Sequence, residues 1–201
     1  MKAVILDLPP AFLEDRCRRG ADRWDESWDG VLHMPPAPNR VHQNLEGELE
    51  GWLRWYWARP SGNRVYHQIN LALPGGWPLD YRIPDLILLT PDRFHIDRNE
   101  RFEGPPTAVV EIHSPGDESH EKLAFYESLG VPDVWIIHRD SRRIEIWSLI
   151  DDNLSRQNPD VDGWLDSPAT GLHLRTVPDQ RLEIEPVAHP ELRARLPAEN
   201  V

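Results

Sequence analysis

The chain has 201 residues, of which 39% are hydrophobic and 28% are charged, a size and composition that fit one globular domain and exclude a collagen-like or low-complexity polymer. Its 34 acidic residues against 22 basic ones give a formal net charge of -12, which argues against any function that needs a polyanion to approach the whole surface. The longest apolar runs, 86–89 and 134–137, fall far short of the ~18 residues that a transmembrane helix needs. We therefore expect a single domain over residues 1–201 that does not enter a membrane.

The first residues of the chain and its cysteine content predict a cytoplasmic protein. The apolar run that starts at Ala3 breaks at Asp7, and no small-residue cleavage site follows it, so the segment is unlike a signal peptide. Cys17 is the only cysteine. Neither an intrachain disulfide nor a thiolate metal site can therefore form, as is expected in a reducing compartment.

The amino-terminal part of the chain predicts a short helix, a small hairpin and one long helix. The segment Pro9–Gly20 is typical of a helix that ends at a glycine. The turn signal Asp29-Gly30 predicts a hairpin. Asn39 is a suitable N-cap for the long helix, whose apolar residues recur every four positions and predict a stripe that packs along a sheet. These residues are Val41, Leu45, Leu49, Leu53 and Trp57.

The rest of the chain predicts strands interrupted by one helix. Three strands are expected at 64–73, 82–89 and 107–113. Pro84 should lie at the entry of the second, because proline cannot donate within a ladder. A helix over 119–129, closed by Gly130, precedes a hairpin of strands at 131–138 and 143–149, and two further strands are expected at 172–177 and 181–184. This order predicts an α/β fold with a mixed sheet flanked by helices.

Two acids interrupt otherwise apolar strands. Asp85 lies in the second predicted strand, and Glu111 lies within the third. A buried carboxylate must be paired or bind a cation, because an unpaired buried charge is costly. Oxygen ligands favour Mg²⁺ or Mn²⁺ over zinc. The alternatives are that Asp85 accepts backbone N–H bonds at a strand end and that Glu111 pairs with Lys122 or an arginine, but two such acids together favour a metal site.

An ordered series of motifs surrounds the two acids. It comprises Pro84-Asp85, Gly104-Pro105-Pro106, Val109-Val110-Glu111-Ile112-x-Ser114-Pro115, Glu121-Lys122-Leu123-x-x-Tyr126 and Gly130-Val131-Pro132-x-x-Trp135, with Asp29-Gly30-Val31-Leu32-x-Met34 and His42-Gln43 upstream. The series resembles the putative restriction endonuclease family of bacteria, a branch of the PD-(D/E)xK nuclease superfamily. The resemblance covers roughly residues 24–150 as a nuclease-like core, and more faintly the C-terminal strands and tail over 151–201; an ordered series is more specific than any single motif.

The resemblance implies a restriction-endonuclease-like fold and metal-dependent hydrolysis of phosphodiester bonds. Asp85 and Glu111 match the two acids, which would hold Mg²⁺ or Mn²⁺ together with the backbone carbonyl of Ile112. In the superfamily's simplest form, a lysine follows the second acid by two positions, where this chain has His113. The resemblance therefore implies that the catalytic lysine has moved to the next helix, at Lys122. His113 would be a hydrogen-bonding neighbour or a substitute for the lysine.

Helical spacing agrees with the choice of Lys122. Lys122, Tyr126 and Leu129 recur at steps of four and three, which places them on one helix face that leans over the end of the strand bearing Glu111. Lys122 would orient the attacking water or stabilise the developing charge. The alternatives are that Lys122 is a solvated helix lysine and that His113 is a half-exposed polar residue at a strand end.

Other polar and aromatic residues are left without a firm assignment. Glu46 and Glu50 lie one turn apart on the polar side of the long helix and are expected to face water, although either could add an acid to the site. His42 is undecided. The nine tryptophans could stack on unpaired bases, but four of them lie in apolar segments, where core packing or a homodimer contact is favoured. These four are Trp52, Trp55, Trp57 and Trp135.

We expect a Mg²⁺-dependent endonuclease that acts on nucleic acid, with DNA as the favoured substrate. The alternative is a catalytically inactive nuclease fold that serves as a binding or assembly module, which would account for the strongly negative charge. A metallohydrolase that uses the histidines is less favoured, because no HxH or HExxH spacing occurs. The sequence leaves open RNA as a substrate and the oligomeric state.

Overall fold

A six-stranded mixed sheet forms the centre of the fold. The computed structural model of the chain describes residues 3–5, 10–20, 22–35 and 37–198. In the spatial order β12-β11-β10-β9-β7-β4, the strands of the central sheet are β12 (Asn153–Arg156), β11 (Ile144–Ile150), β10 (Asp133–His138), β9 (Ala108–His113), β7 (Leu86–Leu89) and β4 (Arg64–His67). β9 and β10 pair in parallel, and the other neighbours are antiparallel. The predicted α/β fold with a mixed sheet is confirmed.

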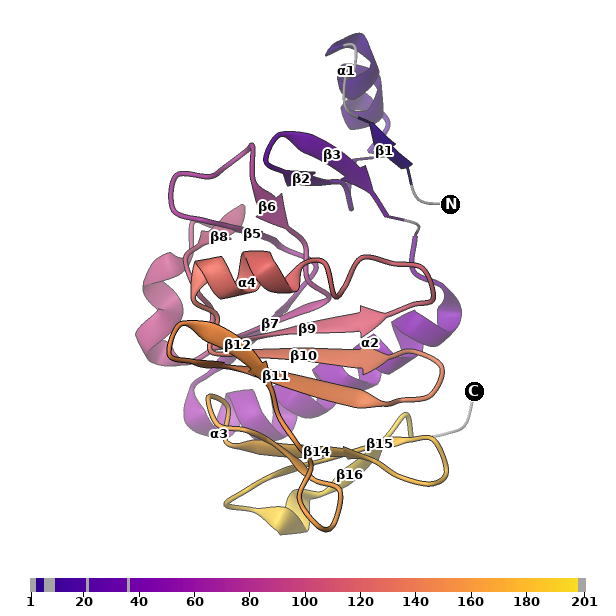
Figure 1. Ribbon diagram of the computed structural model, residues 1–201, viewed down its shortest axis with the longest axis vertical. Helices are drawn as coiled ribbons and strands as arrows, with labels where there is room; N and C mark the ends of the chain where they lie inside the picture. Colours follow the sequence, from indigo (N-terminus) through magenta and orange to yellow (C-terminus); the bar gives the residue numbers. More distant parts are fainter. Residues whose placement is uncertain (1–2, 6–9, 21, 36, 199–201) are drawn as a thin grey trace.

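The two parallel strands are buried on both faces, as strands between two layers must be. Val109, Val110 and Ile136 are inaccessible to solvent. The helix α4 (Leu123–Leu129) covers one face and α2 (Arg40–Trp52) covers the other (Figure 1). Gly130 closes α4 as predicted, but the helix starts later than predicted because residues 119–122 form turns.

The long helix begins where the sequence predicts and then changes its winding. Asn39 caps α2 with its side chain, which accepts a hydrogen bond from the backbone N of His42 (3.0 Å). The helix continues as the π-helical segment η1 (Leu53–Ala58) and the short α3 (Arg59–Ser61). A π-helix closes i→i+5 bonds and so holds more residues per turn than an α-helix. An apolar spacing of four residues therefore stays on one face through the change in winding.

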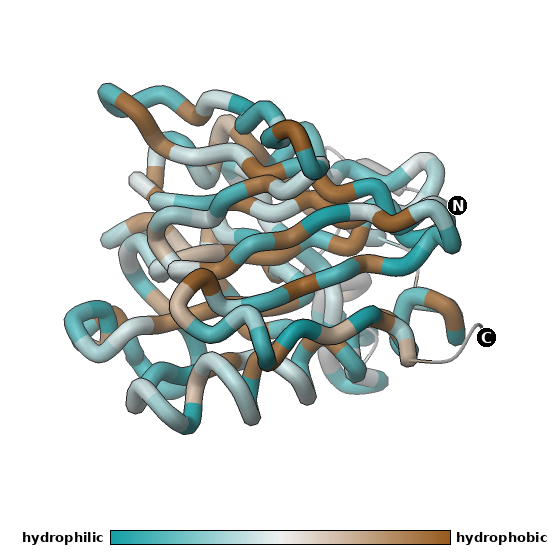
Figure 2. The backbone as a smooth tube through the Cα atoms, turned by 90° about the horizontal axis from the view of Figure 1, so that it is seen from below, coloured by the Kyte–Doolittle hydropathy of each residue, from teal (hydrophilic) through white to brown (hydrophobic). Residues whose placement is uncertain are grey.

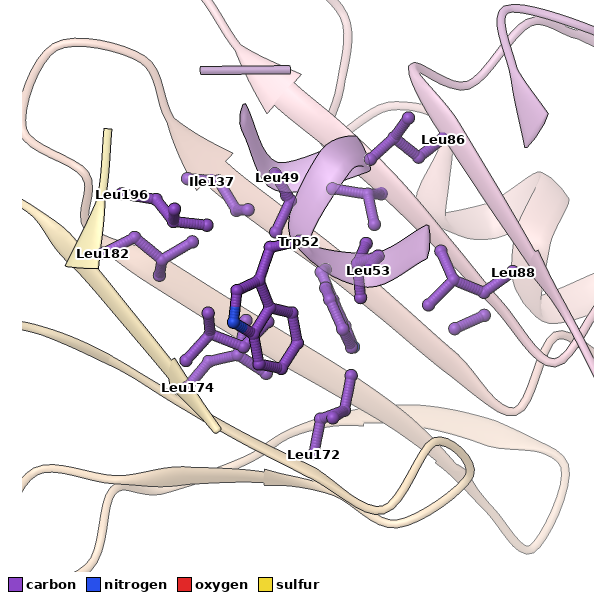
Figure 3. Packing of buried hydrophobic residues seen from close by; sticks show 14 of the residues in the cluster. Leu49, Trp52, Leu53, Leu86, Leu88, Ile137, Leu172, Leu174, Leu182 and Leu196 are labelled. Carbon is purple, nitrogen blue, oxygen red and sulfur yellow. The ribbon is translucent and has the colours of Figure 1, made fainter. Parts of the chain in front are cut away.

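A second core layer lies between α2 and a four-stranded antiparallel sheet near the C-terminus. Its strands are β13 (Leu165–Ser167), β14 (Leu172–Thr176), β15 (Leu182–Pro186) and β16 (Ala194–Leu196), with the 3₁₀ turn η3 (Pro190–Leu192) before the last. Figure 3 shows Leu49 and Trp52 of α2 among the leucines of this sheet and of the central sheet. The sequence predicts β14 and β15 but misses β12, β13 and β16, because strands of three or four residues are too short to show a clear alternation.

A third sheet contains the amino-terminal hairpin. In the order β1-β3-β2-β6-β5-β8, its strands are β1 (Ala3–Ile5), β3 (Val31–Met34), β2 (Glu26–Trp28), β6 (Tyr81–Arg82), β5 (Asn70–Ala72) and β8 (Arg101–Glu103). The predicted hairpin is β2 and β3, which pair across Asp29-Gly30. The predicted first helix is α1 (Pro10–Arg18), while Pro9 lies outside the described residues. A 3₁₀ turn, η2 (Pro91–Ile96), follows β7.

Two of the predicted strands are wrong, because each is divided between two sheets. The segment 64–73 forms β4 and β5, with a turn at Gln68 (φ 46°), and the segment 82–89 forms β6 and β7, with residues 83–85 outside any strand. Pro84 cannot donate to a ladder, so strand pairing stops there. The backbone N of Gln68 donates to the carbonyl of Asp85 (3.1 Å). This hydrogen bond connects the two places where strand pairing is interrupted. Asp85 therefore lies at the end of a β-ladder instead of inside one.

Hydrophobic residues follow these layers. In Figure 2 the hydrophobic segments run along the strands and helices, whereas many of the connecting loops are hydrophilic. Within the part of the chain that the structure describes, no helix has both the length and the apolar composition required to cross a bilayer.

The variant Leu49→Ala tests the role of α2 in joining the two core layers. Leu49 is completely buried, so its truncation should lower the free energy of unfolding by about 3 kcal/mol through lost burial and the cavity left behind. Leu79→Ala is the matched control, because Leu79 is 66% exposed, and it should change stability by less than about 0.5 kcal/mol. Urea unfolding followed by circular dichroism measures both values. Equal effects of the two changes would contradict this account of the core.

Candidate active site

A cavity of about 270 Å³ lies between the amino-terminal sheet, the start of α2 and the central sheet. Its walls come from the hairpin β2–β3, the start of α2, the non-strand residues before β5 and before β7, the end of β9 and the loop that leads to α4. Four of the residues predicted from the sequence line it, namely Asp85, Glu111, Ile112 and Lys122. Glu26 and His42 line it as well. The cavity therefore brings together side chains from segments that are far apart in the sequence.

Glu111 projects from β9 toward the start of α4. Its side chain is 5% exposed and accepts a hydrogen bond from the hydroxyl of Tyr126. The ammonium of Lys122 lies 3.1 Å and 3.2 Å from the two carboxylate oxygens of Glu111. Lys122 and Tyr126 are four residues apart, so both reach the same carboxylate. The face that helical spacing predicts is the one that contacts Glu111.

A further carboxylate, Glu26 of β2, lies on the other side of Lys122. The Lys122 Nζ is 2.8 Å from Glu26 Oε1. Glu26 is held in place by the backbone N of Ile83 (2.8 Å) and by the indole N–H of Trp28 (2.8 Å). The lysine side chain is 11% exposed, so Lys122 is a buried cation between two carboxylates and not a solvated helix lysine.

Asp85 connects the end of β9 to α2. Its Oδ2 accepts a hydrogen bond from the backbone N of Ile112 (2.6 Å), and its Oδ1 lies 2.9 Å from Nε2 of His42. The backbone contact is the strand-end role that the sequence leaves open as an alternative. Burial lowers the pKa of His42, but the hydrogen bond to Asp85 outweighs this effect together with the neighbouring charges, and the pKa is raised overall. His42 therefore holds its proton to a higher pH than a free imidazole does.

Glu46 is buried at this site, so the expectation that it faces water is wrong. Its side chain is 7% exposed and lies 3.8 Å from Nε2 of His42. It accepts a hydrogen bond from the amide of Gln68 (3.4 Å), while its Oε1 finds no hydrogen-bond donor among the described residues. The turn at Gln68 covers this side of α2, which widens the buried face beyond the apolar stripe. Glu50, one turn later, pairs with the exposed side chain of Arg54 (2.6 Å).

Burial and mutual repulsion change the ionisation of these acids. Burial raises the pKa of Glu111 to about 8, an effect that Lys122 opposes and that Asp85 and Glu26 reinforce. Burial also raises the pKa of Glu46 to about 7, again reinforced by Asp85. Burial lowers the pKa of Lys122, but its two carboxylate partners outweigh that effect and raise the pKa overall. The ammonium therefore stays charged, and the cavity remains short of positive charge.

The donor set fits a hard divalent cation. Acidic residues outnumber basic ones among the residues that line the cavity, and Glu46 beside it has a buried oxygen that finds no donor in the described part of the chain. Ligand atoms of His42, Glu46 and Asp85 all lie within 4.8 Å of one another, and Asp85 shares the cavity with Glu111 and Ile112. Oxygen-rich sites of this kind suit Mg²⁺ or Mn²⁺.

His113 is not among the residues that line the cavity. It ends β9 beside His138 of β10, and its Nδ1 lies 2.7 Å from Asp117. Its ring contacts the rings of His138 and His120, with centroids 4.8 Å and 5.1 Å away. The structure therefore places His113 in a separate histidine cluster and not beside Asp85 and Lys122.

Sequence reasoning missed the part played by Glu26 and left Glu46 and His42 without a role. Glu26 stands just before the Asp29-Gly30 turn, and only the buried position of β2 in the fold distinguishes it from other acids. His42 and Glu46 do carry a local signal, because they lie one helical turn apart directly after the N-cap Asn39. A polar pair on one helix face beside an apolar stripe can mark the rim of a site.

The fold is similar to that of a nuclease-class structure. The crystal structure of a putative nuclease belonging to DUF820 from Anabaena variabilis ATCC 29413 matches with a TM-score of 0.58 and 15% sequence identity, over 73% of this chain and 82% of that one. Identity this low supports the fold alone. The model of the Uma2 family, described as putative restriction endonuclease, matches residues 10–182, and the chain belongs to this family. No curated protein matches it significantly.

The raised pKa of Glu46 predicts how stability depends on pH. With a pKa of about 7 in the folded protein against about 4.3 in an unfolded chain, folded Glu46 holds its proton over a range in which the unfolded chain has lost it. Stability should therefore fall as the pH rises between these two values. In Glu46→Gln this fall should be smaller by about 2 kcal/mol.

Urea unfolding at about pH 5 and about pH 8, in chelator, measures this difference. Glu50→Gln is the matched control, because Glu50 lies one turn along the same helix and pairs with a surface arginine. Glu50→Gln should keep the wild-type pH dependence. If Glu46→Gln keeps it too, Glu46 is not the group that titrates.

Proposed function

We propose that the protein is a metal-dependent endonuclease that hydrolyses phosphodiester bonds, with DNA as its substrate. The observation that carries this proposal is the meeting of Asp85, Glu111 and Lys122 in one cavity, with Lys122 in contact with Glu111. The chain belongs to a family described as putative restriction endonuclease, and the fold is similar to that of a putative nuclease. A carboxylate pair with a buried lysine matches the chemistry of phosphoryl transfer, which depends on positioning and on stabilising negative charge.

In this proposal Asp85 and Glu111 hold Mg²⁺ or Mn²⁺, with the backbone carbonyl of Ile112 as a further ligand. When bound, the ion lowers the pKa of a water molecule and neutralises charge on the scissile phosphate. His42 keeps the Asp85 carboxylate in position through a 2.9 Å contact. Glu46 is a neighbouring acid that could share the ion through the same cluster.

Lys122 stabilises negative charge that develops on the phosphate. Its Nζ contacts both Glu26 and Glu111, so the ammonium is held in place before substrate arrives, which lowers the cost of reorganisation during the reaction. Tyr126 fixes the Glu111 carboxylate from the other side. The role of Glu26 is to position Lys122, because it contacts the ammonium and is itself anchored to the backbone of Ile83.

Metal dependence follows from the charge of the cavity. Lys122 and Arg139 are the permanently positive residues among the described residues that line it, and the whole chain has a formal net charge of -12. A phosphate therefore enters a negative site unless a cation is present. Binding should be weak and should depend steeply on salt.

The central test is cleavage of DNA by the full chain at low salt. We expect cleavage with Mg²⁺ or Mn²⁺ and none with EDTA. Glu111→Gln, which preserves the shape of the side chain but removes the charge of a ligand, should lower the rate at least about 100-fold, and Lys122→Gln should do the same by removing charge stabilisation worth about 3 kcal/mol. Glu191→Gln, at an exposed acid outside the cavity, is the control and should cleave like the wild type.

The inactive binding module is the alternative outcome of this experiment. It predicts no turnover under any of these conditions and association with a partner that does not depend on metal. Each variant is assayed below its own unfolding temperature, because Lys122→Gln leaves two buried carboxylates without their cation and should destabilise the fold by about 3 kcal/mol. Absence of divalent-ion binding at millimolar concentration, measured by calorimetry, would exclude the proposed enzyme.

A further inference from the structure

A second cluster of potential ligands lies beside the candidate active site. Ligand atoms of His120, His138 and Glu145 all lie within 4.8 Å of one another. The Nε2 of His138 is 2.8 Å from Glu145 Oε1, and the Nε2 of His120 is 3.4 Å from Glu145 Oε2. None of these three residues lines the cavity that holds Asp85 and Glu111.

The register of the central sheet creates this cluster. His113 and His138 are paired at the ends of the parallel strands β9 and β10, and Glu145 of β11 pairs with Ile136, two residues before His138. Side chains two residues apart share a face of a sheet, so the three point to the face covered by α4. The loop that leads to α4 then adds His120 from above the same face. Three adjacent strand segments and one loop therefore converge.

We propose that His120, His138 and Glu145 form a binding site for a divalent transition-metal ion of the Zn²⁺ type. Two imidazoles and one carboxylate are the ligands that Zn²⁺ takes in open sites, where water fills the fourth position. Donor atoms around a tetrahedral ion with bonds of ~2.1 Å lie roughly 3.4 Å apart. The distance from His120 to Glu145 Oε2 is 3.4 Å, whereas the 2.8 Å contact of His138 with Oε1 would have to lengthen when the ion binds. This site does not depend on the proposed nuclease activity.

Neighbouring side chains hold the ligands in place. The ring of His113 lies edge-on to both His120 and His138, and its Nδ1 lies 2.7 Å from Asp117 without the geometry of a hydrogen bond. Glu145 is 4% exposed, so its carboxylate is fixed in the sheet. Pre-positioned ligands of this kind lower the cost of binding an ion.

The guanidinium of Arg143 already lies beside His138 and Glu145, with its Nη1 2.6 Å from Glu145 Oε1, so this position favours a cation. The Nε2 of His138 lies against the acceptor Glu145 Oε1 and also against the donor Nη2 of Arg143. A single ring nitrogen can donate or accept, but not both. A metal ion at this position would bind the nitrogen lone pair and the carboxylate together. Arg143 is 50% exposed, so its guanidinium can turn to solvent when the ion binds.

Binding of an ion at this site would fix the loop between β9 and α4. His120 belongs to residues 114–122, several of which line the candidate active site, and Lys122 ends this segment. An ion shared by His120, His138 and Glu145 would tie the loop to the hairpin β10–β11. The effect proposed for this ion is to hold the loop in place, and its binding should be visible without any measurement of catalysis.

Titration of the metal-free full chain with Co²⁺ tests this site. Co²⁺ stands in for Zn²⁺ and gives intense visible absorption only when its coordination is close to tetrahedral, so weak absorption is expected from an oxygen-rich site such as the candidate active site. We expect one equivalent of intense absorption, removed by Zn²⁺. His120→Gln and His138→Gln should each weaken Co²⁺ binding about 100-fold or more. His120 is 38% exposed, so its replacement should leave the fold intact, as thermal unfolding checks.

Two controls identify the site. His189→Gln, at a histidine that is 64% exposed and far along the chain, and the double variant Asp85→Asn with Glu111→Gln should both keep the absorption. Arg143→Ala should tighten Co²⁺ binding by about tenfold, because it removes a competing positive charge close to the ion. No intense absorption, absorption that survives in His120→Gln, or weaker or unchanged binding in Arg143→Ala would overturn the proposal.

Discussion

The burial of the Lys122 ammonium between Glu26 and Glu111 is the interaction on which the arrangement of the site depends. Its Nζ lies 2.8 Å from Glu26 and 3.1 Å from Glu111, and those acids belong to different sheets. A buried carboxylate is costly unless it is paired, so each acid requires the lysine and the lysine requires both. This one contact fixes the amino-terminal hairpin, the end of β9 and the start of α4 relative to one another.

The interruptions in strand pairing determine the position of Asp85. A continuous strand over 82–89 would have carried Asp85 inside a ladder. Because pairing stops at Pro84, Asp85 lies at the end of the ladder, where its carboxylate caps the backbone N of Ile112 and reaches His42. The turn at Gln68 is connected to Asp85 by a backbone hydrogen bond. The same turn covers Glu46 on α2. The irregular segments at Gln68 and Pro84 thus position the side chains of the site, and the regular central sheet provides the framework to which these segments are attached.

The sequence predicts the features that depend on local pattern. The N-cap at Asn39, the apolar strand β9 and the closure of α4 at Gly130 follow from residue type and spacing alone. Sequence-based prediction fails for features that depend on tertiary contacts. The burial of Glu46 depends on a turn more than twenty residues away, and the role of Glu26 depends on a lysine in another layer, so neither is visible in a local window. The resemblance to a nuclease family supplied Lys122, which spacing alone would not have separated from a surface lysine.

Two charge clusters share one loop, and their proximity matters for the proposed nuclease activity because the protein as a whole is acidic. Glu111 and His113 are two residues apart on β9, yet Glu111 joins the carboxylate and lysine cluster and His113 joins the histidines. The loop after β9 carries His120 toward the second cluster and Lys122 toward the first. A cation bound at the histidines would add positive charge beside a cavity in whose lining acidic residues outnumber basic ones, and it would hold the segment of Lys122 in place. With a formal net charge of -12, bound cations are the direct means by which this surface can receive a phosphate.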